Sequence, residues 1–110
     1  MKIETTSLGK ANVIKLGGRL DAESATQFTA ACQNCLDGGT RHIVLDLGEL
    51  QYISSAGLGS IIRLAKKMEG LGGVVLLCGV KGLVKEVFVV TNLLPLFKVF
   101  DSADAACQSI

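Results

Sequence analysis

Two adjacent hydroxyl groups, those of Ser54 and Ser55, are the groups in this chain best placed to take part in chemistry. They lie in the segment YISSAGLGS, residues 52–60, between an apolar run and an amphipathic run. The apolar run predicts a buried strand and the amphipathic run predicts a helix. The serines therefore fall at a helix N-terminus, where free N–H groups and the helix dipole favour negative charge. A serine in this position suits either a helix N-cap or an acceptor of phosphate.

The residues that would turn these serines into a catalytic site are missing from the sequence. The single histidine, His42, stands at the start of the predicted strand. The nucleophile elbow of hydrolases needs a glycine two places before the serine, where Ile53 stands before Ser55. The segment that contains Gly57 and Gly59 has neither the lysine of a P-loop nor the third glycine of a dinucleotide-binding motif. A serine without a base is a poor nucleophile, so we expect no enzyme but a substrate for another protein's kinase.

The cysteines include one CxxC pair, Cys32 and Cys35, which could indicate metal or redox chemistry. Their helical spacing from Phe28 and Leu36 places both thiols on one apolar face. No second CxxC or histidine pair completes a zinc site. We expect buried, reduced, structural thiols, with no metal and no cofactor.

The acidic residues Asp21, Asp46 and Glu49 are scattered and do not form a spaced metal-binding loop. Asp21 has the residue type and position of a helix N-cap. Asp46 lies inside the strand that we expect to be buried, so it needs a partner. It is the acid that we expect to contact the loop carrying the two serines.

Length and composition predict a single domain, residues 1–110, with 49% apolar residues and a formal charge of +1. That charge offers no general attraction to nucleic acid or anionic lipid, so neither is an expected partner. The longest uncharged apolar stretches, 70–80 and 87–97, are shorter than the roughly 20 residues that span a bilayer. The N-terminus lacks the continuous apolar block of a secretory signal. A cytoplasmic protein is the simplest interpretation.

Strands and helices are expected to alternate after an N-terminal hairpin. The predicted strands cover residues 2–7, 11–17, 41–47, 74–80 and 97–100, and the predicted helices 22–36, 55–69, 83–91 and 103–109. Gly17 and Gly18 are expected to end the second strand, and residues 48–52 to form a loop. Gly79 is expected to allow another element to approach closely. The alternation predicts an α/β fold, with a mixed, mainly parallel sheet, an N-terminal antiparallel hairpin and about four flanking helices.

The whole chain resembles a STAS domain, and specifically the bacterial anti-sigma factor antagonists. The most specific stretch is RHIVLDLGELQYISSAGLGSII, residues 41–62. Three further stretches support it: LGGRLDAESA at 16–25, GGVVLLCGVKGLVKEVF at 72–88 and TNLLPLFKVFDSADAA at 91–106. The resemblance implies the STAS fold, a sheet flanked by helices.

The resemblance also implies a role for Ser55, the serine two places before the glycine of the S-[SA]-G-L motif. In the family this serine is phosphorylated by the cognate anti-sigma factor, a Ser/Thr kinase that binds the ATP. The unphosphorylated antagonist binds the kinase and frees the sigma factor, and a PP2C-type phosphatase restores this form. Many members carry Asp just before the phosphorylated serine, where this chain has Ser54.

Phosphorylation at a helix N-terminus is expected to leave the fold almost unchanged and to act on the interface with the partner. The expected partner-binding residues are Asp21, Ser54, Ser55, Ala56, Gly57, Leu58 and Gly59. One alternative is a constitutive STAS scaffold subunit of a larger signalling or transport complex, in which Ser55 is only an N-cap. Another, with little support in the sequence, is a small enzyme with a pocket near Gly57.

Overall fold

The computed structural model describes all residues, 1–110, and contains one five-stranded sheet. The strands are β1 (Lys2–Leu8), β2 (Ala11–Leu20), β3 (His42–Ile53), β4 (Val74–Cys78) and β5 (Lys98–Phe100). They lie side by side in sequence order, with β1 antiparallel to β2 and every later pair parallel. The prediction of a mainly parallel sheet with an N-terminal antiparallel hairpin is confirmed.

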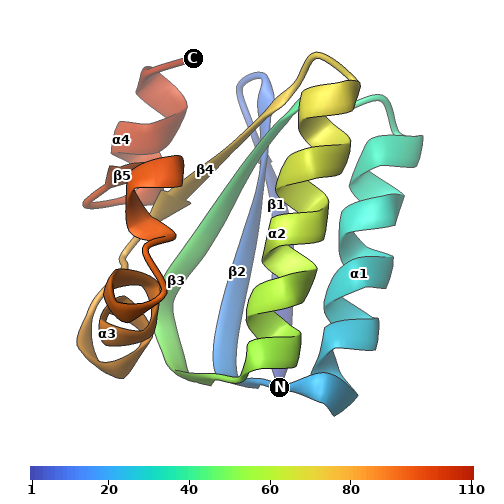
Figure 1. Cartoon of the computed structure of the whole chain (residues 1–110). Helices are drawn as coiled ribbons and strands as arrows, with labels where there is room; N and C mark the ends of the chain where they lie inside the picture. The colour runs from blue at the N-terminus through green and yellow to red at the C-terminus, as the bar shows by residue number, and fades with distance from the viewer.

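Helices fill the connections between the parallel strands, which need a crossover long enough to return to the same edge of the sheet. These crossover helices are α1 (Ala22–Asp37), α2 (Ser55–Gly70) and α3 (Gly82–Val90), with a short 3-10 helix η1 (Leu94–Leu96) before β5, whereas α4 (Ala103–Gln108) follows the last strand. The four predicted helices are confirmed, whereas η1 was not predicted. In Figure 1, α1 and α2 run side by side in front of the sheet, and α4 lies at the back. No helix combines the length and the apolar character needed to cross a membrane.

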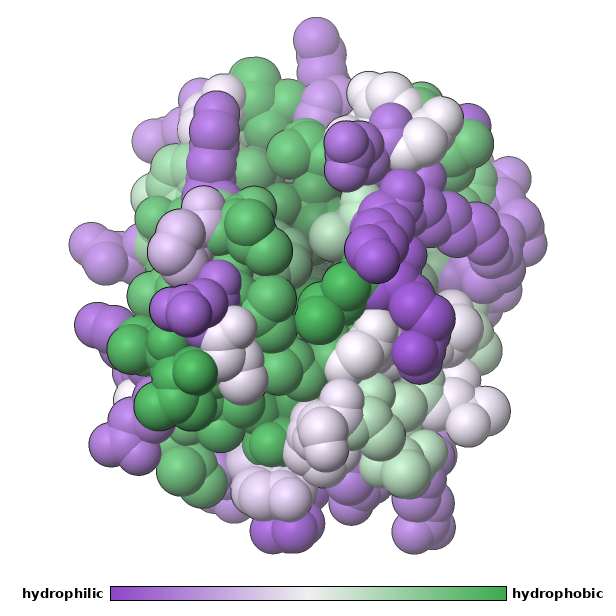
Figure 2. Space-filling model, viewed as in Figure 1, coloured by the Kyte–Doolittle hydropathy of each residue, from purple (hydrophilic) through white to green (hydrophobic).

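Two apolar clusters hold the helices to opposite faces of the sheet. The larger joins α1, α2 and α3 to one face, through residues such as Phe28, Ile61 and Phe88. The smaller joins Ala106 of α4 to Val44 and other residues on the opposite face. Exposed apolar side chains remain on α3 and η1 and form the hydrophobic area on the left of Figure 2. The face of the sheet that carries α1, α2 and α3 is therefore closed by a continuous core.

The strands β2 and β3 are longer than predicted, and the predicted loop at 48–52 is wrong. Pairing continues past Gly17 to the carboxyl end of both strands, with register shifts on either side of the Gly17–Gly18 pair. Gly18 adopts a φ of +92°, a conformation that residues other than glycine rarely adopt. The glycines form irregularities of the bulge type rather than a strand end. A bulge breaks the two-residue alternation of side chains, so the sequence pattern here resembles that of a loop.

The strand β4 ends at Cys78, two residues earlier than predicted. Gly79 follows with a φ of +68°, and a Cβ atom there would lie 2.8 Å from the backbone nitrogen of Gly48. The expected close approach at Gly79 is therefore confirmed, and the approaching element is β3.

Candidate functional site

The segment 54–60 begins where the carboxyl ends of two neighbouring parallel strands meet. Leu20 and Ile53, the last residues of β2 and β3, are paired in the sheet. The backbone N–H of Ser54 then donates to the carbonyl of Leu20 over 2.9 Å. Both strands pass directly into helices, so the N-termini of α1 and α2 lie side by side at one end of the molecule (Figure 1).

Ser54 is the N-cap of α2. Its backbone is extended, and its Oγ accepts a hydrogen bond of 3.1 Å from the N–H of Gly57. The side chain thereby satisfies one of the free N–H groups of the first turn. The predicted start of the helix at Ser55 is confirmed. Ser55 is not the N-cap that the scaffold alternative assumed, because Ser54 occupies that position.

Ser55 is the first helical residue of α2, and it is exposed. Its hydroxyl makes no hydrogen bond within the chain, so the oxygen is open to solvent at the positive end of the helix dipole. The only histidine, His42, stands at the opposite end of β3. Ser55 therefore has the access that a modifying enzyme needs and no imidazole that would make it a nucleophile.

The other residues of the segment divide between the core and the surface. Leu58 belongs to the core, and Gly57 is buried against β2, where a Cβ atom would fall on the carbonyl oxygen of Leu20. Ala56 is exposed and Gly59 is half-buried. The surface of the segment at the helix start is thus made mainly by Ser55 and Ala56.

Asp21 caps the neighbouring helix in the same way. It forms a capping box with Ser24, whose N–H donates to the Asp21 carboxylate over 3.1 Å. The hydrogen bonds from Ser24 lower the pKa of Asp21. Since Asp21 directly follows Leu20, to which Ser54 is bonded, the two caps lie close together at the same end of the molecule.

Asp46 does not make the predicted contact with the serine loop. Its carboxylate accepts a hydrogen bond of 3.0 Å from the N–H of Gly48, and its neighbours across the sheet are Lys15 and Cys78. The reason is the length of β3, which continues for seven residues beyond Asp46 and carries the serines away from it.

The predicted burial of the CxxC thiols is confirmed, since Cys32 and Cys35 both lie on the buried face of α1. Burial raises the pKa of the Cys32 thiol to about 12. None of the four cysteines is paired in a disulfide. No three or more His, Cys, Asp or Glu side chains lie together in a way that could hold a metal ion.

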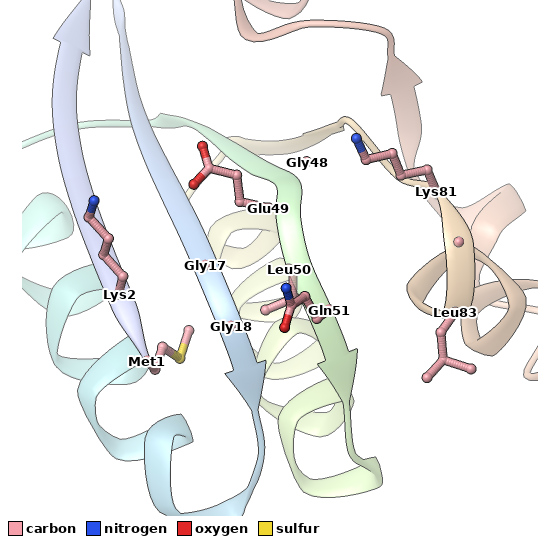
Figure 3. A pocket seen from close by; sticks show the side chains of 11 residues that line it. Met1, Lys2, Gly17, Gly18, Gly48, Glu49, Leu50, Gln51, Lys81 and Leu83 are labelled. Atoms are coloured by element: carbon pink, nitrogen blue, oxygen red, sulfur yellow. The ribbon is translucent and has the colours of Figure 1, made fainter.

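A hollow of about 890 Å³ lies away from the serines, beside the bulged parts of β2 and β3. Figure 3 shows its side chains, with Lys2 on β1, Glu49 on β3 and Lys81 before α3. Its other lining residues include the glycines of the bulge and the Gly48 backbone. This hollow cannot be predicted from the sequence, because it depends on a bulge that the alternation of side chains does not reveal.

A second groove, about 520 Å³, runs between α1 and α2 and does reach the segment. Its lining consists of small or neutral residues and one cation: Ala22, Ala25, Thr26, Thr29, Ala30, Gln33, Ala56 and Arg63. Ala56 therefore connects the exposed start of α2 with a groove that contains no carboxylate.

The family model of the STAS domain matches residues 2–106 of the chain. Among curated proteins, the chain is 37% identical to BtrV of Bordetella bronchiseptica, named as an anti-sigma factor antagonist, over 99% of this chain and 94% of that protein. It is also 27% identical to the anti-sigma-B factor antagonist of Staphylococcus aureus, over 94% of this chain and 96% of that protein.

Solved structures agree with this match at the level of the fold. The crystal structure of a protein from Thermotoga maritima, described as an anti-sigma factor antagonist, has a TM-score of 0.90 and 24% identity, and the match covers 98% of this chain and 93% of that one. The Bacillus cell fate determinant SpoIIAA in its phosphorylated form has a TM-score of 0.77 and 20% identity, with 99% and 100% covered. The chain belongs to the STAS domain family, and within it to the anti-sigma factor antagonists.

Proposed function

We propose that this anti-sigma factor antagonist is a non-enzymatic switch controlled by phosphorylation of Ser55. In the unphosphorylated form it binds an anti-sigma Ser/Thr kinase and frees the sigma factor, and in the phosphorylated form it releases that kinase. The observation that carries the proposal is the free, exposed hydroxyl of Ser55 at the first position of α2.

The difference between the two serines supports Ser55 as the acceptor. The Ser54 oxygen is already engaged as the N-cap, so a phosphate there would have to replace the hydrogen bond to Gly57. At Ser55 the phosphate would enter solvent beside the positive end of the helix. That position stabilises a negative charge by about 0.3–1 kcal/mol at an exposed site. The fold of α2 is therefore compatible with both states of Ser55.

Phosphorylation would act chiefly on the interface with the kinase. It adds about −1.5 to −2 charges and three acceptor oxygens to a surface that otherwise docks the partner. Each 1.4 kcal/mol of lost binding energy lowers the affinity about tenfold, so a desolvation cost of a few kcal/mol is enough for release. The proposed contact surface consists of Asp21 with the exposed parts of Ser54, Ser55, Ala56 and Gly59. Gly57 and Leu58 contribute by fixing the backbone that presents them.

The remaining parts of the cycle belong to other proteins. The chain has no phosphate-binding lysine motif, so the kinase supplies the ATP, and a PP2C-type phosphatase would restore Ser55. The cycle would take place in the cytoplasm, with this chain acting as one STAS domain. The names of the relatives agree with this role, and the structural neighbour SpoIIAA has been solved in a phosphorylated form.

A binding experiment with the purified anti-sigma kinase from the same genome tests the proposal. We expect Ser55→Ala to bind with the affinity of the wild-type protein, and Ser55→Glu to bind at least about tenfold more weakly because it adds charge at the interface. Ser7→Glu is the matched control, since Ser7 is an exposed serine on β1, away from the proposed surface. Equal affinities for all four proteins would contradict the switch and favour a constitutive scaffold subunit.

A further inference from the structure

Arg63 is a cation on α2 that has no partner in the chain. Its side chain is exposed, and the only two ion pairs of the structure are Lys2–Glu4 and Lys15–Glu49. The guanidinium also makes none of the side-chain hydrogen bonds, whereas Lys67, one turn further along, donates to the amide oxygen of Gln33. An unpaired guanidinium beside an interhelical groove is available to an anion.

The guanidinium of Arg63 is turned back along the helix towards Ser55. A Cβ atom placed on Gly59 would lie 3.4 Å from Nη1 of Arg63, so the side chain extends over the glycine one turn before it. Gly59 is four residues from Ser55, which corresponds to about 6 Å along the helix axis. A glycine at position 59 thus leaves the path open between the guanidinium and the first turn.

The charges around this path favour an anion at its open end. Ala56 and Arg63 line the same groove between α1 and α2, and none of the lining residues is acidic. No carboxylate in the groove therefore competes for the guanidinium. A phosphate on Ser55, next to Ala56, would place a negative charge at this end of the groove.

We propose that Arg63 binds the phosphate on Ser55, so that the switch residue in its modified state is held against its own helix. The inference rests on the proposed phosphorylation of Ser55. A guanidinium presents parallel N–H donors that match two phosphate oxygens, and such charged hydrogen bonds are stronger than neutral ones. Arg63 acts here as a positioning residue that orders the phosphate and neutralises part of its charge.

The test uses protein in which phosphoserine is inserted at position 55 during translation, so that no kinase is needed. The second ionisation of the phosphate is followed by 31P NMR as a function of pH. A nearby guanidinium favours the dianion, so Arg63→Gln should raise the second pKa of the phosphoserine by at least about half a unit. An unchanged pKa in Arg63→Gln would overturn the proposal.

Lys66→Gln is the matched control, because it removes the same charge from an exposed position on the same helix. Lys66 lies eleven residues beyond Ser55, about 16 Å along the axis, so its removal should leave the titration unchanged. Equal shifts in both variants would also overturn the proposal, since they would reflect net charge alone. Unmodified Arg63→Gln should melt at the temperature of the wild-type protein, which separates the effect from a loss of folding.

Phosphate mapping and the titration together distinguish failure of the Ser55 switch from failure of the Arg63 contact. If the kinase modifies a residue other than Ser55, the phospho-switch at Ser55 fails, whatever the titration shows. If the kinase modifies Ser55 and the titration shows no effect of Arg63, the switch is supported and the proposed binding of the phosphate by Arg63 is wrong.

Discussion

The inward-facing and outward-facing residues of the segment 54–60 have different roles, although they alternate along the sequence. On the inward side, Ser54 caps the helix and Gly57 is buried against the end of β2. On the outward side, Ser55 and Ala56 are exposed, and Gly59 meets only the flexible end of Arg63. Residues of the same type therefore have opposite roles, one fixed by the fold and the other free for a partner.

The segment 54–60 combines two requirements at the start of one helix. The inward residues fix the start of α2 relative to β2, and the outward residues are then presented in a defined position. Substitutions on the inward side should change stability, and substitutions on the outward side should change recognition. Three predictions test this division, each with a pair of similar residues.

Gly57→Ala should have the largest effect, because the new methyl group would meet the backbone carbonyl of Leu20, which cannot move aside as a flexible side chain can. Overpacking costs about 1–3 kcal/mol of unfolding free energy, and we expect the upper end of this range because the neighbour is fixed backbone. Urea unfolding measures the loss. Gly70→Ala, in the same helix with open space around it, is the control. A Gly57→Ala protein as stable as the control would refute the close packing of α2 on β2.

Ser54→Ala should cost about 1 kcal/mol, the usual loss when an N-cap hydroxyl is removed. Ser55→Ala should change the unfolding free energy by less than about 0.5 kcal/mol, as expected for an exposed side chain without partners. The two variants differ only in which neighbouring hydroxyl is lost, so chemical denaturation compares the roles directly. The account is wrong if Ser55→Ala proves the more destabilising of the two.

Gly59→Ala should have the opposite sign to Gly57→Ala, because its new methyl group meets no fixed atom. Alanine raises helix stability over glycine by up to about 1 kcal/mol, and only the guanidinium of Arg63 has to shift. Thermal unfolding should therefore give a midpoint equal to or above that of the wild-type protein. A loss as large as that of Gly57→Ala would show that the outward side is as tightly packed as the inward side.

Much of this fold could be predicted from the sequence, because the apolar runs and helical stripes were long and were separated by glycines. The prediction failed at Gly17–Gly18 and at residues 48–52, where bulges interrupt the alternation on which strand prediction depends. The same error placed Asp46 near the serines, since a shorter β3 would have ended close to it. The positions of the long-range neighbours, such as Leu20 beside Gly57, depend on strand register and cannot be read from local patterns.

The two serines show the same limit at the site. Local pattern placed a helix start at this pair, but it could not say which hydroxyl was used by the backbone. That assignment depends on the hydrogen bond from the N–H of Gly57 to the hydroxyl of Ser54, which identifies Ser54 as the N-cap. Because Ser54 is the cap, a serine at this position has a physical reason in this chain, since serine is a good N-cap.

Mapping the phosphate after incubation with the anti-sigma kinase and ATP tests whether Ser55 is the acceptor. Mass spectrometry of proteolytic fragments should find one phosphate on Ser55 in the wild-type protein and none in Ser55→Ala. Because the claim depends on the free hydroxyl of Ser55, Ser54→Ala should still be modified. Phosphate on Ser54, on another residue, or on none would contradict the account.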